Sequence, residues 1–589
     1  MDQLSPQKLF RTIKENRSLL LLFCAAAWSG YSLVFLFSDA QVYAPLGLLL
    51  SPVLLGFFRL HLRDRQTLRT GERILCLALA CGSACALYLS ADVSGRFDAA
   101  VSSLGAFAVR AFCIAGTAVL LYALFCAFCG LCLRKTKQRP AKPFTRRGFV
   151  ILWAVFFGVW FALYLVCFYP GLFSPDTAGQ LYMVEGTRAW DNHHPVLHTV
   201  ILYFTMRLTG FRPVFYVFFQ TLVMSALMAY TCVWVRNRRI SEWVWCGVFL
   251  YFLLHPIFAV NTFSFIKDTL FSGAILFFTL HIADAILTPE QTRNASYLFR
   301  LTVSALLVLF LRNNGFFVVL LTFAALVIFL RGQRLRMALV GGGSFVFFCF
   351  VQFVAFPILG VAQTSTAESL GIPLQMLCSV IAAGKTYSAD IMQYLNRILP
   401  LETMAEVFDP QVVDPIKFDE AFNIAVIDGD LPRFLLVWAR GLLQHPLEYV
   451  KAYLCITRFL WDPMQKAGMI ESVYSSPYFT FFTPRPLIPA LSSVYYAVIN
   501  LSQNSRYAFF TRPFWNTAVT YLVSALCATA TLRKTHAKQL LIWIPAFAVW
   551  ASLMISTPIA TCGRYALSAF LCLPVFVCLA VSQAPQREA

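Results

Sequence analysis

The chain has 589 residues, of which 59% are hydrophobic and 13% are charged, and its mean hydropathy is +0.69. For the chain as a whole, these values exclude a soluble globular protein. The net charge of +19 does not indicate nucleic-acid binding, because the lysines and arginines cluster between apolar segments, as the orientation of a membrane protein requires. Many of these segments reach the roughly 20 residues that a helix needs to cross a bilayer. The sequence therefore predicts an all-α polytopic membrane protein.

The first expected crossing lies at the N-terminus. Basic residues between Lys8 and Arg17 precede an apolar stretch that continues to about Phe37. This stretch is too long for the apolar region of a signal peptide. We expect a membrane anchor whose N-terminus is cytoplasmic.

Five basic clusters set the expected orientation of the remaining chain, since Lys and Arg are enriched in cytoplasmic loops. Placing all five inside predicts about fourteen crossings, with both termini cytoplasmic. The clusters lie at residues 59–73, 134–147, 236–239, 331–336 and 533–538. The crossings are expected at residues 17–37, 43–60, 74–91, 109–133, 148–168, 213–235, 241–261, 269–287, 297–311, 315–331, 336–356, 514–532, 539–557 and 565–583.

Two apolar segments do not fit this alternation as crossings. Pro195–Thr209 and Leu487–Leu501 are short and contain tyrosines, so we expect helices that lie along the outer membrane surface. The segment 357–484 is rich in acids and contains no convincing crossing, which predicts an extracytoplasmic, soluble, α-rich domain. The expected organisation has four parts: N-terminal crossings at 1–147, a core at 148–356, the outer domain at 357–484 and a C-terminal part at 485–589.

The loop at 169–195 contains the densest group of reactive side chains, including Asp176, Asp191, His193 and His194. It directly follows an expected crossing. Ionisable groups at a membrane boundary are costly to hold, so they indicate a functional site. Two structural interpretations remain open: a polar loop that only joins helices, and a His-His-Pro turn that only begins the next helix.

Further charged residues are expected at the same outer surface. Lys267-Asp268 can be a local ion pair at a helix start, and Arg312 can extend its charge to the interface. Arg312 and Arg564 nevertheless lie outside in this topology, against the usual distribution of cations. Because the arginine fork matches phosphate oxygens, these positions favour an anionic ligand.

No nucleotide-binding element is visible in the sequence, so an outward-facing enzyme would need a substrate that is already activated. A polyprenyl-phosphate sugar meets this need, since its lipid tail can lie between crossings. Transfer to a hydroxyl requires a base, for which Asp176 is the best-placed residue. The histidines can bind phosphate or relay a proton. A divalent metal is an open alternative, with Asp176 and His194 as candidate ligands.

Four motifs occur in a characteristic order over residues 148–583. They are Ser174-Pro-Asp176-Thr-Ala-Gly-Gln180, His194-Pro195-Val-Leu197, Arg312-Asn313-Asn314-Gly315 and Gly563-Arg564-Tyr565. In these motifs the chain resembles the polytopic glycosyltransferases of the GT-C fold, which include the protein O-mannosyltransferases, the aminoarabinose lipid A transferases and the RgtA-like transferases. It looks most like a poorly characterised bacterial family of predicted GT-C membrane proteins. The usual acidic pair of that class is absent, and four additional crossings come first.

The resemblance implies a GT-C-like core and an inverting transfer of a sugar from a polyprenyl-phosphate donor to an envelope or lipid acceptor, on the outer face of the cell membrane. Asp176 is the expected catalytic residue. Donor binding and loop organisation are expected of Gln180, Asp191, His193, His194, Lys267, Asp268, Arg312, Asn313, Arg564 and Tyr565. The alternatives are a transporter or flippase and a polymer ligase for a lipid-linked glycan. A transporter would place charges near the bilayer midplane and show paired halves, whereas this sequence has neither.

Overall fold

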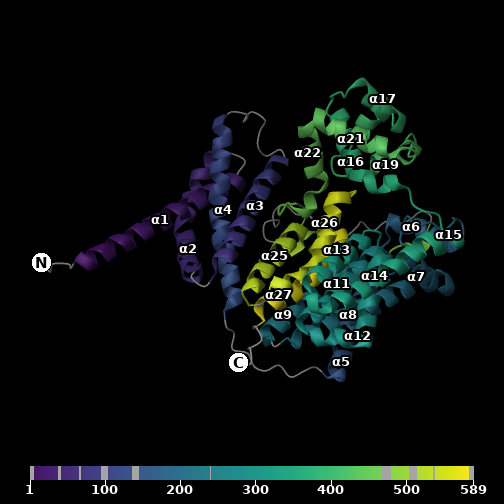
Figure 1. Cartoon of the computed structure of the whole chain (residues 1–589), viewed down its shortest axis with the longest axis horizontal. Coiled ribbons are helices and arrows are strands. Elements are labelled where there is room, and N and C mark those ends of the chain that lie inside the picture. The colour runs from purple at the N-terminus through teal and green to yellow at the C-terminus, as the bar shows by residue number, and fades with distance from the viewer. Residues whose placement is uncertain are drawn as a thin grey trace.

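The computed structural model describes residues 6–37, 41–65, 68–93, 104–134, 145–238, 240–465, 479–502, 514–534 and 537–582. Within these ranges the protein contains helices and isolated β-bridges but no strands. The predicted all-α class is therefore confirmed. Figure 1 shows three groups of helices: an N-terminal bundle, a larger central bundle and an outer domain above the central bundle.

The helices fall into these groups in chain order. The N-terminal bundle contains α1 (Pro6–Phe37), α2 (Ser51–Arg65), α3 (Thr70–Val93) and α4 (Leu104–Leu133). The central bundle begins with α5 (Arg146–Leu163), α6 (Pro175–Glu185), α7 (Val196–Met206), α8 (Pro213–Arg236), α9 (Glu242–Leu254), α10 (Pro256–Phe263), α11 (Lys267–Leu287), α12 (Ala295–Leu311), α13 (Gly315–Phe329), α14 (Arg334–Phe350) and α15 (Phe356–Ile358).

The outer domain and the C-terminal helices complete the chain. The outer domain consists of α16 (Gly371–Ala382), α17 (Ala389–Ile398), α18 (Leu401–Glu406), α19 (Asp414–Lys417), α20 (Ala425–Asp428), α21 (Leu431–Gln444) and α22 (Pro446–Ile456). The chain then returns to the central bundle through α23 (Pro489–Ile499), α25 (Thr517–Lys534), α26 (Ile544–Ser556) and α27 (Leu567–Val581).

Ten of the described helical segments are long and apolar enough to cross a membrane, which supports a multi-pass membrane protein. They are Leu19–Phe37, Thr70–Ala91, Phe107–Leu133, Arg146–Phe168, Pro213–Arg236, Glu242–Phe263, Lys267–Leu287, Arg331–Ile358, Ala537–Ser556 and Gly563–Val581. The other four expected crossings coincide with shorter apolar helices at Pro45–Arg59, Ala295–Leu311, Gly315–Phe329 and Thr517–Leu532. The count of fourteen therefore stays a prediction.

Two helices form the centre of the bundle. In the most apolar stretches of Lys267–Leu287 and Gly563–Val581, 78% and 83% of the residues are buried, against 22% for Arg146–Phe168. α11 packs against α27, α26, α12 and α8. Lys267 begins the first of these central segments and Arg564 lies at the start of the second. Both cations are thus fixed at the ends of the most enclosed helices.

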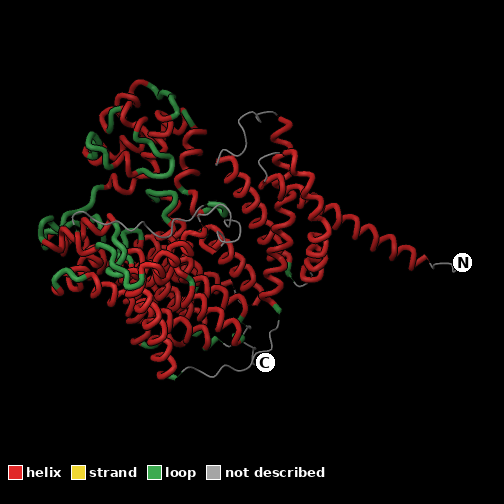
Figure 2. The backbone as a smooth tube through the Cα atoms, turned by 180° about the vertical axis from the view of Figure 1, so that it is seen from behind, coloured by secondary structure: helices red, strands yellow, loops and turns green. Residues whose placement is uncertain are grey.

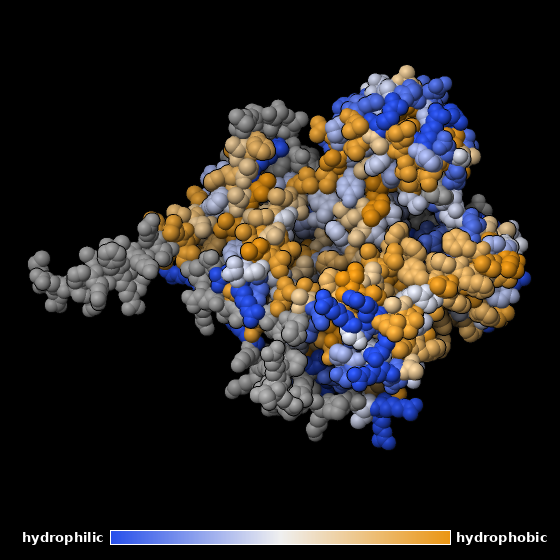
Figure 3. Space-filling model, viewed as in Figure 1, coloured by the Kyte–Doolittle hydropathy of each residue, from blue (hydrophilic) through white to orange (hydrophobic). Residues whose placement is uncertain are grey.

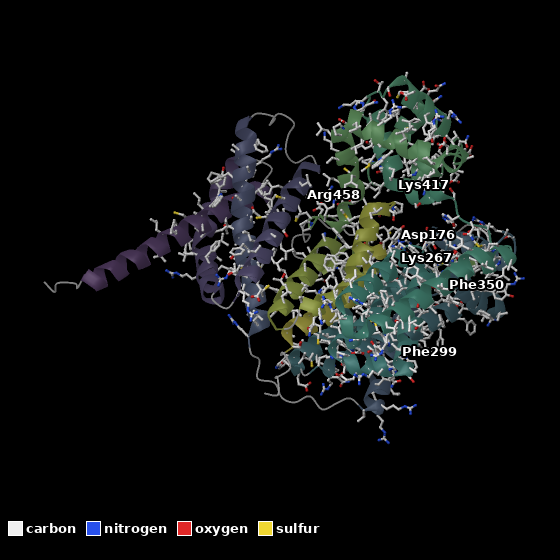
Figure 4. The ribbon with its side chains drawn as sticks, viewed as in Figure 1. Asp176, Lys267, Phe299, Phe350, Lys417 and Arg458 are labelled. Atoms are coloured by element: carbon white, nitrogen blue, oxygen red, sulfur yellow. The ribbon has the colours of Figure 1, made fainter. Side chains whose placement is uncertain are left out.

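The N-terminal bundle joins the rest of the protein through a buried ion pair. Arg458 Nε donates to Asp462 Oδ2 at 2.6 Å, and Ser90 Oγ from α3 donates to the same oxygen at 2.7 Å. Asp462 is completely buried. Figure 4 labels Arg458 between α3 and the outer domain. Because a buried carboxylate is costly without donors, these contacts fix α3 against the end of the outer domain.

The outer domain has a hydrophobic core of its own, separate from that of the bundle. Its core includes Leu377, Ile391, Phe434 and Tyr449, all of which are fully buried. Figure 3 shows that hydrophilic residues gather on this domain and at the opposite end of the molecule, with apolar surface between them. Figure 2 shows loops gathered between the domain and the outer ends of the bundle helices.

The hairpin of α12 and α13 confirms the expectation of two helices that meet at Arg312–Gly315. In this turn Gly315 provides the space for a close approach of the two helices. A Cβ at Gly315 would lie 1.9 Å from the carbonyl oxygen of Val308. The close approach of these two helices therefore requires glycine.

We expect Gly315→Ala to destabilise the protein by about 1–3 kcal/mol, because the added methyl overlaps the backbone of α12. Gly343→Ala in α14 is the matched control, since no atom of the described residues lies within 4 Å of the place that a Cβ at Gly343 would take, and alanine favours helix by up to about 1 kcal/mol. The thermal midpoint of the detergent-solubilised protein is the measurement. Equal midpoints for the two variants would contradict the close approach.

Candidate functional site

The site begins in the loop that precedes α6. The amide of Leu172 donates to the carbonyl of Phe263 at 3.0 Å, and the amide of Phe265 donates to the carbonyl of Leu172 at 2.9 Å. Gly171 adopts φ 131°, and a Cβ there would lie 2.8 Å from the Phe265 ring. Only glycine fits this backbone conformation and this space. The loop is therefore held against the segment that leads into α11.

Asp176 lies in the first turn of α6, which Ser174 precedes as the N-cap residue and Pro175 begins. Proline is suited to the first helical position, and an acidic side chain there interacts favourably with the helix dipole. The hydroxyl of Thr177 donates to the carbonyl of Phe265. This contact fixes the first turn of α6 beside the start of α11, where Lys267 lies.

Asp176 accepts hydrogen bonds from two cations that come from distant parts of the chain. Its Oδ2 lies 3.3 Å from Lys267 Nζ and 2.9 Å from Arg564 Nη2. Lys267 Nζ is also 3.2 Å from His194 Nδ1, and Arg564 Nη1 donates to Ser174 Oγ at 3.1 Å. Figure 4 labels Asp176 and Lys267 side by side below the outer domain. The site thus joins α6, α11 and the turn before α27.

A second carboxylate supports this cluster from inside the bundle. Asp268 is fully buried, with Oδ1 2.7 Å from Arg312 Nη1 and Oδ2 3.7 Å from Arg564 Nε. The guanidinium of Arg312 also lies over the ring of Tyr565, 4.5 Å from its centroid. A cation over an aromatic face is attracted by the ring quadrupole. These contacts hold both arginines in place at the floor of the site.

The cluster contains one more cationic side chain than carboxylates. Its three cations are Lys267, Arg312 and Arg564, and its two carboxylates are Asp176 and Asp268. The carboxylate of Asp268 is enclosed, whereas the side chain of Asp176 is 35% exposed. Within this partly desolvated cluster the cations therefore outnumber the carboxylates by one, while the outer-domain side of the cavity adds Lys417, Glu368 and Asp414.

A cavity of about 810 Å³ lies above this cluster. The bundle contributes Asp176, His194, Lys267 and Arg564 to its walls, and the outer domain contributes the helix α19. Volumes of this order are typical of small-molecule sites. Figure 4 shows Lys417 of α19 directly above Asp176. The cavity is thus enclosed between the membrane helices and the outer domain.

Backbone pairing fixes the outer domain over the cavity. The amide of Val413 donates to the carbonyl of Pro558 at 3.0 Å, and the amide of Ala560 donates to the carbonyl of Gln411 at 2.7 Å. The segment that contains Pro558 and Ala560 connects α26 to Arg564. The outer domain is therefore held by the same connection that carries one of the site cations.

Two carboxylates of the cavity have pKa values shifted in opposite directions. Burial raises the pKa of Asp176, but the charges of Lys267 and Arg564 outweigh it and hold this pKa well below its usual range. Burial raises the pKa of Asp414, to which Asp176 adds, although Lys417 opposes the shift. Asp176 is therefore firmly ionised, while Asp414 retains more of its basicity.

His194 is held in its neutral form. Burial lowers its pKa well below 6.5, and the charge of Lys267 lowers it further, while Asp176 opposes the shift. A neutral imidazole can accept a hydrogen bond from Lys267 on Nδ1 and present the proton on Nε2. The site therefore offers a neutral donor beside two fixed cations.

Most of the predicted site residues do meet at this cavity. Eight of them line it, namely Asp176, His193, His194, Lys267, Arg312, Asn313, Arg564 and Tyr565. Asp268 lies behind the lining, between the two arginines. Asp191 is not in the lining and pairs with Arg188 at 2.6 Å. Its other oxygen accepts from the amide of His193 at 3.0 Å, so it organises the loop before α7.

Gln180 also lies outside the lining, within a buried hydrogen-bonded chain. Its Oε1 is 2.8 Å from His198 Nδ1, and its Nε2 donates to Thr199 Oγ1 at 2.8 Å. His198 Nε2 is in turn 2.8 Å from the hydroxyl of Tyr216, whose oxygen also lies 2.8 Å from Gln220 Oε1. Gln180 therefore fixes α6 against α7 and α8, and this role depends on partners that its own motif does not contain.

The sequence did not single out the outer-domain side of the cavity. Asp414, Lys417 and Glu368 line it, and Lys417 pairs with Glu368 and donates to its carbonyl at 3.2 Å. Glu368 and Asp414 belong to an acid-rich segment, and nothing in the local sequence distinguishes them from its other acids. Only the packing of the outer domain onto the bundle brings them to the site.

The arrangement does not fit the proposed metal ligands. The ammonium of Lys267 lies between Asp176 and His194 and bonds to both, so a cation already occupies the position that a shared metal would take. Among the described residues, no three His, Cys, Asp or Glu side chains gather in a metal-binding group. Lys267 can provide the positive charge that a metal would supply.

Comparison with known proteins identifies a family but no activity. The profile of a family of unknown function (DUF6020) matches residues 177–589, so the chain belongs to this family. The match includes His194, Lys267 and Arg564 and begins one residue after Asp176. No curated protein matches the chain, and no solved structure matches it.

We expect the stability of the protein to fall as the pH drops below about 6.5. Burial lowers the pKa of His198 from 6.5 to about 3. Between these two pH values the unfolded chain binds a proton on this residue and the folded protein does not. Each such proton costs about 1.4 kcal/mol per pH unit, and stability is complete only above pH 6.5. The thermal midpoint measured between pH 8 and pH 5 should show this loss.

His198→Gln should reduce the slope of stability against pH by the equivalent of about one proton. Glutamine can form hydrogen bonds in place of both ring nitrogens, and it does not titrate. The variant will be less stable at pH 8 if the bonds to Gln180 and Tyr216 are imperfectly replaced, but the slope is the informative quantity. An unchanged slope below pH 6.5 would contradict a buried neutral imidazole at this position.

Proposed function

We propose that this member of the DUF6020 family is an integral membrane glycosyltransferase. It transfers a sugar from a polyprenyl-phosphate donor to a glycan or lipid acceptor of the cell envelope. The observation that carries this proposal is the shared carboxylate of Asp176, which holds Lys267 and Arg564 at the wall of a large cavity at the ends of the membrane helices. This arrangement places a potential base beside two cations that can bind a phosphate group.

The donor phosphate would bind where Lys267 and Arg564 now meet Asp176. The two cations favour an anion, and arginine can bind two phosphate oxygens at once. Binding would draw both cations away from Asp176, so its pKa would rise toward the ordinary value. In this proposal the donor itself activates the base, because Asp176 is weakly basic only while it is paired with both cations.

The transfer then requires two coupled bond changes. The acceptor hydroxyl oxygen attacks the anomeric carbon of the sugar and gives its proton to Asp176. The bond between that carbon and the phosphate oxygen breaks, and the polyprenyl phosphate leaves with an additional negative charge. Lys267 and Arg564 stabilise this charge, and neutral His194 can donate to a phosphate or sugar oxygen. Attack from the face opposite the leaving group inverts the anomeric centre.

The walls of the cavity support a substrate that is part lipid and part polar. Phe317 in the first turn of α13 and Phe418 after α19 line the cavity and remain 55% and 70% exposed. Phe317 lies on an apolar helix of the bundle, where a polyprenyl chain can continue into the membrane. The outer-domain side presents Asp414 and Lys417, which suits a polar acceptor.

The proposed location is the cell membrane, with both termini cytoplasmic and the active site on the outer face. The distribution of charge supports this orientation, since Arg331, Arg336 and Lys538 lie at the opposite end of the bundle from Asp176. Basic residues are retained on the cytoplasmic side. Membrane lipids and the lipid-linked donor are the expected partners.

Asp176→Asn should reduce the turnover number by about 10²- to 10⁴-fold, because the amide cannot accept the proton. Donor binding should be unchanged or tighter, since removal of the carboxylate leaves Lys267 and Arg564 free for phosphate. The assay measures sugar transfer from a panel of polyprenyl-phosphate sugars in proteoliposomes, with a chelator present because Lys267 replaces the metal. Full transfer by this variant would remove Asp176 from the mechanism.

Lys267→Gln is the matched control on the binding side of the same contact. It should weaken donor binding by roughly 10- to 100-fold through the loss of one charged hydrogen bond, with a smaller effect on turnover. Arg564→Lys should restore only part of the binding that arginine supplies, because the bidentate fork is lost. A wild-type protein that moves the lipid-linked sugar across the membrane without consuming it would support the flippase alternative instead.

The orientation can be tested with single cysteines in intact cells. Glu406→Cys, on the exposed surface of the outer domain, should react with a membrane-impermeant maleimide, whereas Glu290→Cys, at the opposite end of α11, should not. The background is a variant in which the exposed residues Cys24, Cys81 and Cys85 are serine. The reverse labelling pattern would place the candidate site in the cytoplasm and exclude an extracytoplasmic acceptor.

A further inference from the structure

A second polar cavity lies at the end of the bundle opposite the candidate site. It has a volume of about 330 Å³ and is formed by the end of α11, the turn at Pro289–Arg293, the start of α14 and the segment Ala537–Trp543. α11 extends from Lys267 at the candidate site to this cavity. Its 21 residues span roughly 30 Å, which is about the thickness of the hydrocarbon core. The two cavities are therefore at opposite membrane surfaces.

Four cations and one carboxylate line this cavity: Arg293, Arg331, Arg336, Lys538 and Glu290. Within the described part of the chain, none of the four cations forms an ion pair with a carboxylate. Arg336 Nη1 instead donates to Thr292 Oγ1 at 3.1 Å, which fixes it at the wall. Neighbouring arginines elsewhere at this end are neutralised, as Arg238 is by Asp284. The cavity thus concentrates positive charge that the protein leaves unbalanced.

A buried polar side chain completes the wall. Gln333 is only 8% exposed, and its Nε2 donates to the carbonyl of Ala285 at 3.0 Å. Its Oε1 is buried and accepts no hydrogen bond from the described residues. Gln333 also precedes α14 as its N-cap residue without capping it through its side chain, so the positive end of that helix faces the same region. The carboxamide is therefore held against the end of α11, and its oxygen is enclosed within the protein.

The surface beside the cavity is apolar. Ile328 and Phe329 at the end of α13 are 59% and 56% exposed, and Leu335 and Leu339 at the start of α14 are 72% and 66% exposed. α13 and α14 pack against each other, so these side chains form adjacent apolar surface at the membrane level. A soluble anion would make no favourable contact with this apolar surface, whereas the acyl chains of a lipid can lie along it.

We infer that this cavity binds the headgroup of an anionic phospholipid from the leaflet opposite the candidate site. The arginines and Lys538 bind the phosphate, and the acyl chains lie against α13 and α14. The charge selects an anionic lipid such as phosphatidylglycerol over a zwitterionic one. This site is independent of the proposed transfer reaction.

The test measures lipid retention by native mass spectrometry and lipid-dependent thermal midpoints of the full-length protein in detergent. Dioleoyl phosphatidylglycerol should be retained and should raise the midpoint, whereas dioleoyl phosphatidylcholine should not. Arg331→Gln and Arg336→Gln should each weaken retention about 5-fold, and together roughly 25-fold. Lys538→Gln, on the exposed rim, provides the same test if an arginine variant fails to fold. Arg147→Gln removes one charge from the same end of the molecule but outside the cavity, and it should leave retention unchanged.

Three results would overturn the inference: equal retention of phosphatidylglycerol and phosphatidylcholine, an Arg147→Gln effect as large as that of Arg331→Gln, or equal stabilisation by free glycerol 3-phosphate. The last result would assign the cavity to a soluble anion.

Discussion

The carboxylate of Asp176 is the contact on which the geometry of the site depends. Its Oδ2 holds Lys267 and Arg564, and Arg564 is almost fully buried, with 3% exposure. A buried guanidinium is stable only when carboxylates and acceptors surround it. Asp176 and Asp268 supply this environment from α6 and α11, so the turn before α27 can place its cation beside the cavity. The same contact joins α6, α11 and the turn before α27, and it holds two cations where the proposed anionic substrate would bind.

The outer domain completes this site through two described connections. It is connected to the bundle by backbone pairing between residues 411–413 and 558–560 and by the buried Asp462 junction. Its own core is separate from that of the bundle. Because the paired segment leads directly to Arg564, any displacement of the outer domain would also displace this cation. The position of the outer domain and the position of Arg564 are therefore linked through residues 558–560.

The two ends of the central bundle use positive charge differently. At the outer-domain end, Arg564 shares Asp176 with Lys267 and Asp268 with Arg312, so that three cations face two carboxylates. At the other end, Arg331 and Arg336 line a cavity with few acids. The first arrangement is the one that the proposed transfer reaction uses. The second is suited to a charged group that stays, as an annular lipid does, and α11 connects the two.

The sequence by itself determined the class of the protein and the main members of the site. Apolar length predicted the membrane helices, and charge at the membrane boundary singled out Asp176, Lys267 and Arg564, because both signals are local properties of the chain. Tertiary structure alone decided which polar residues face the cavity. Gln180 and Asp191 lie close to site residues in the sequence, but their side chains bond to His198 and Arg188 and do not line the cavity. Asp414 reaches the cavity only because the outer domain packs onto the bundle. The required space at Gly315 was likewise invisible, since it depends on the distance between two helices and not on the turn residues.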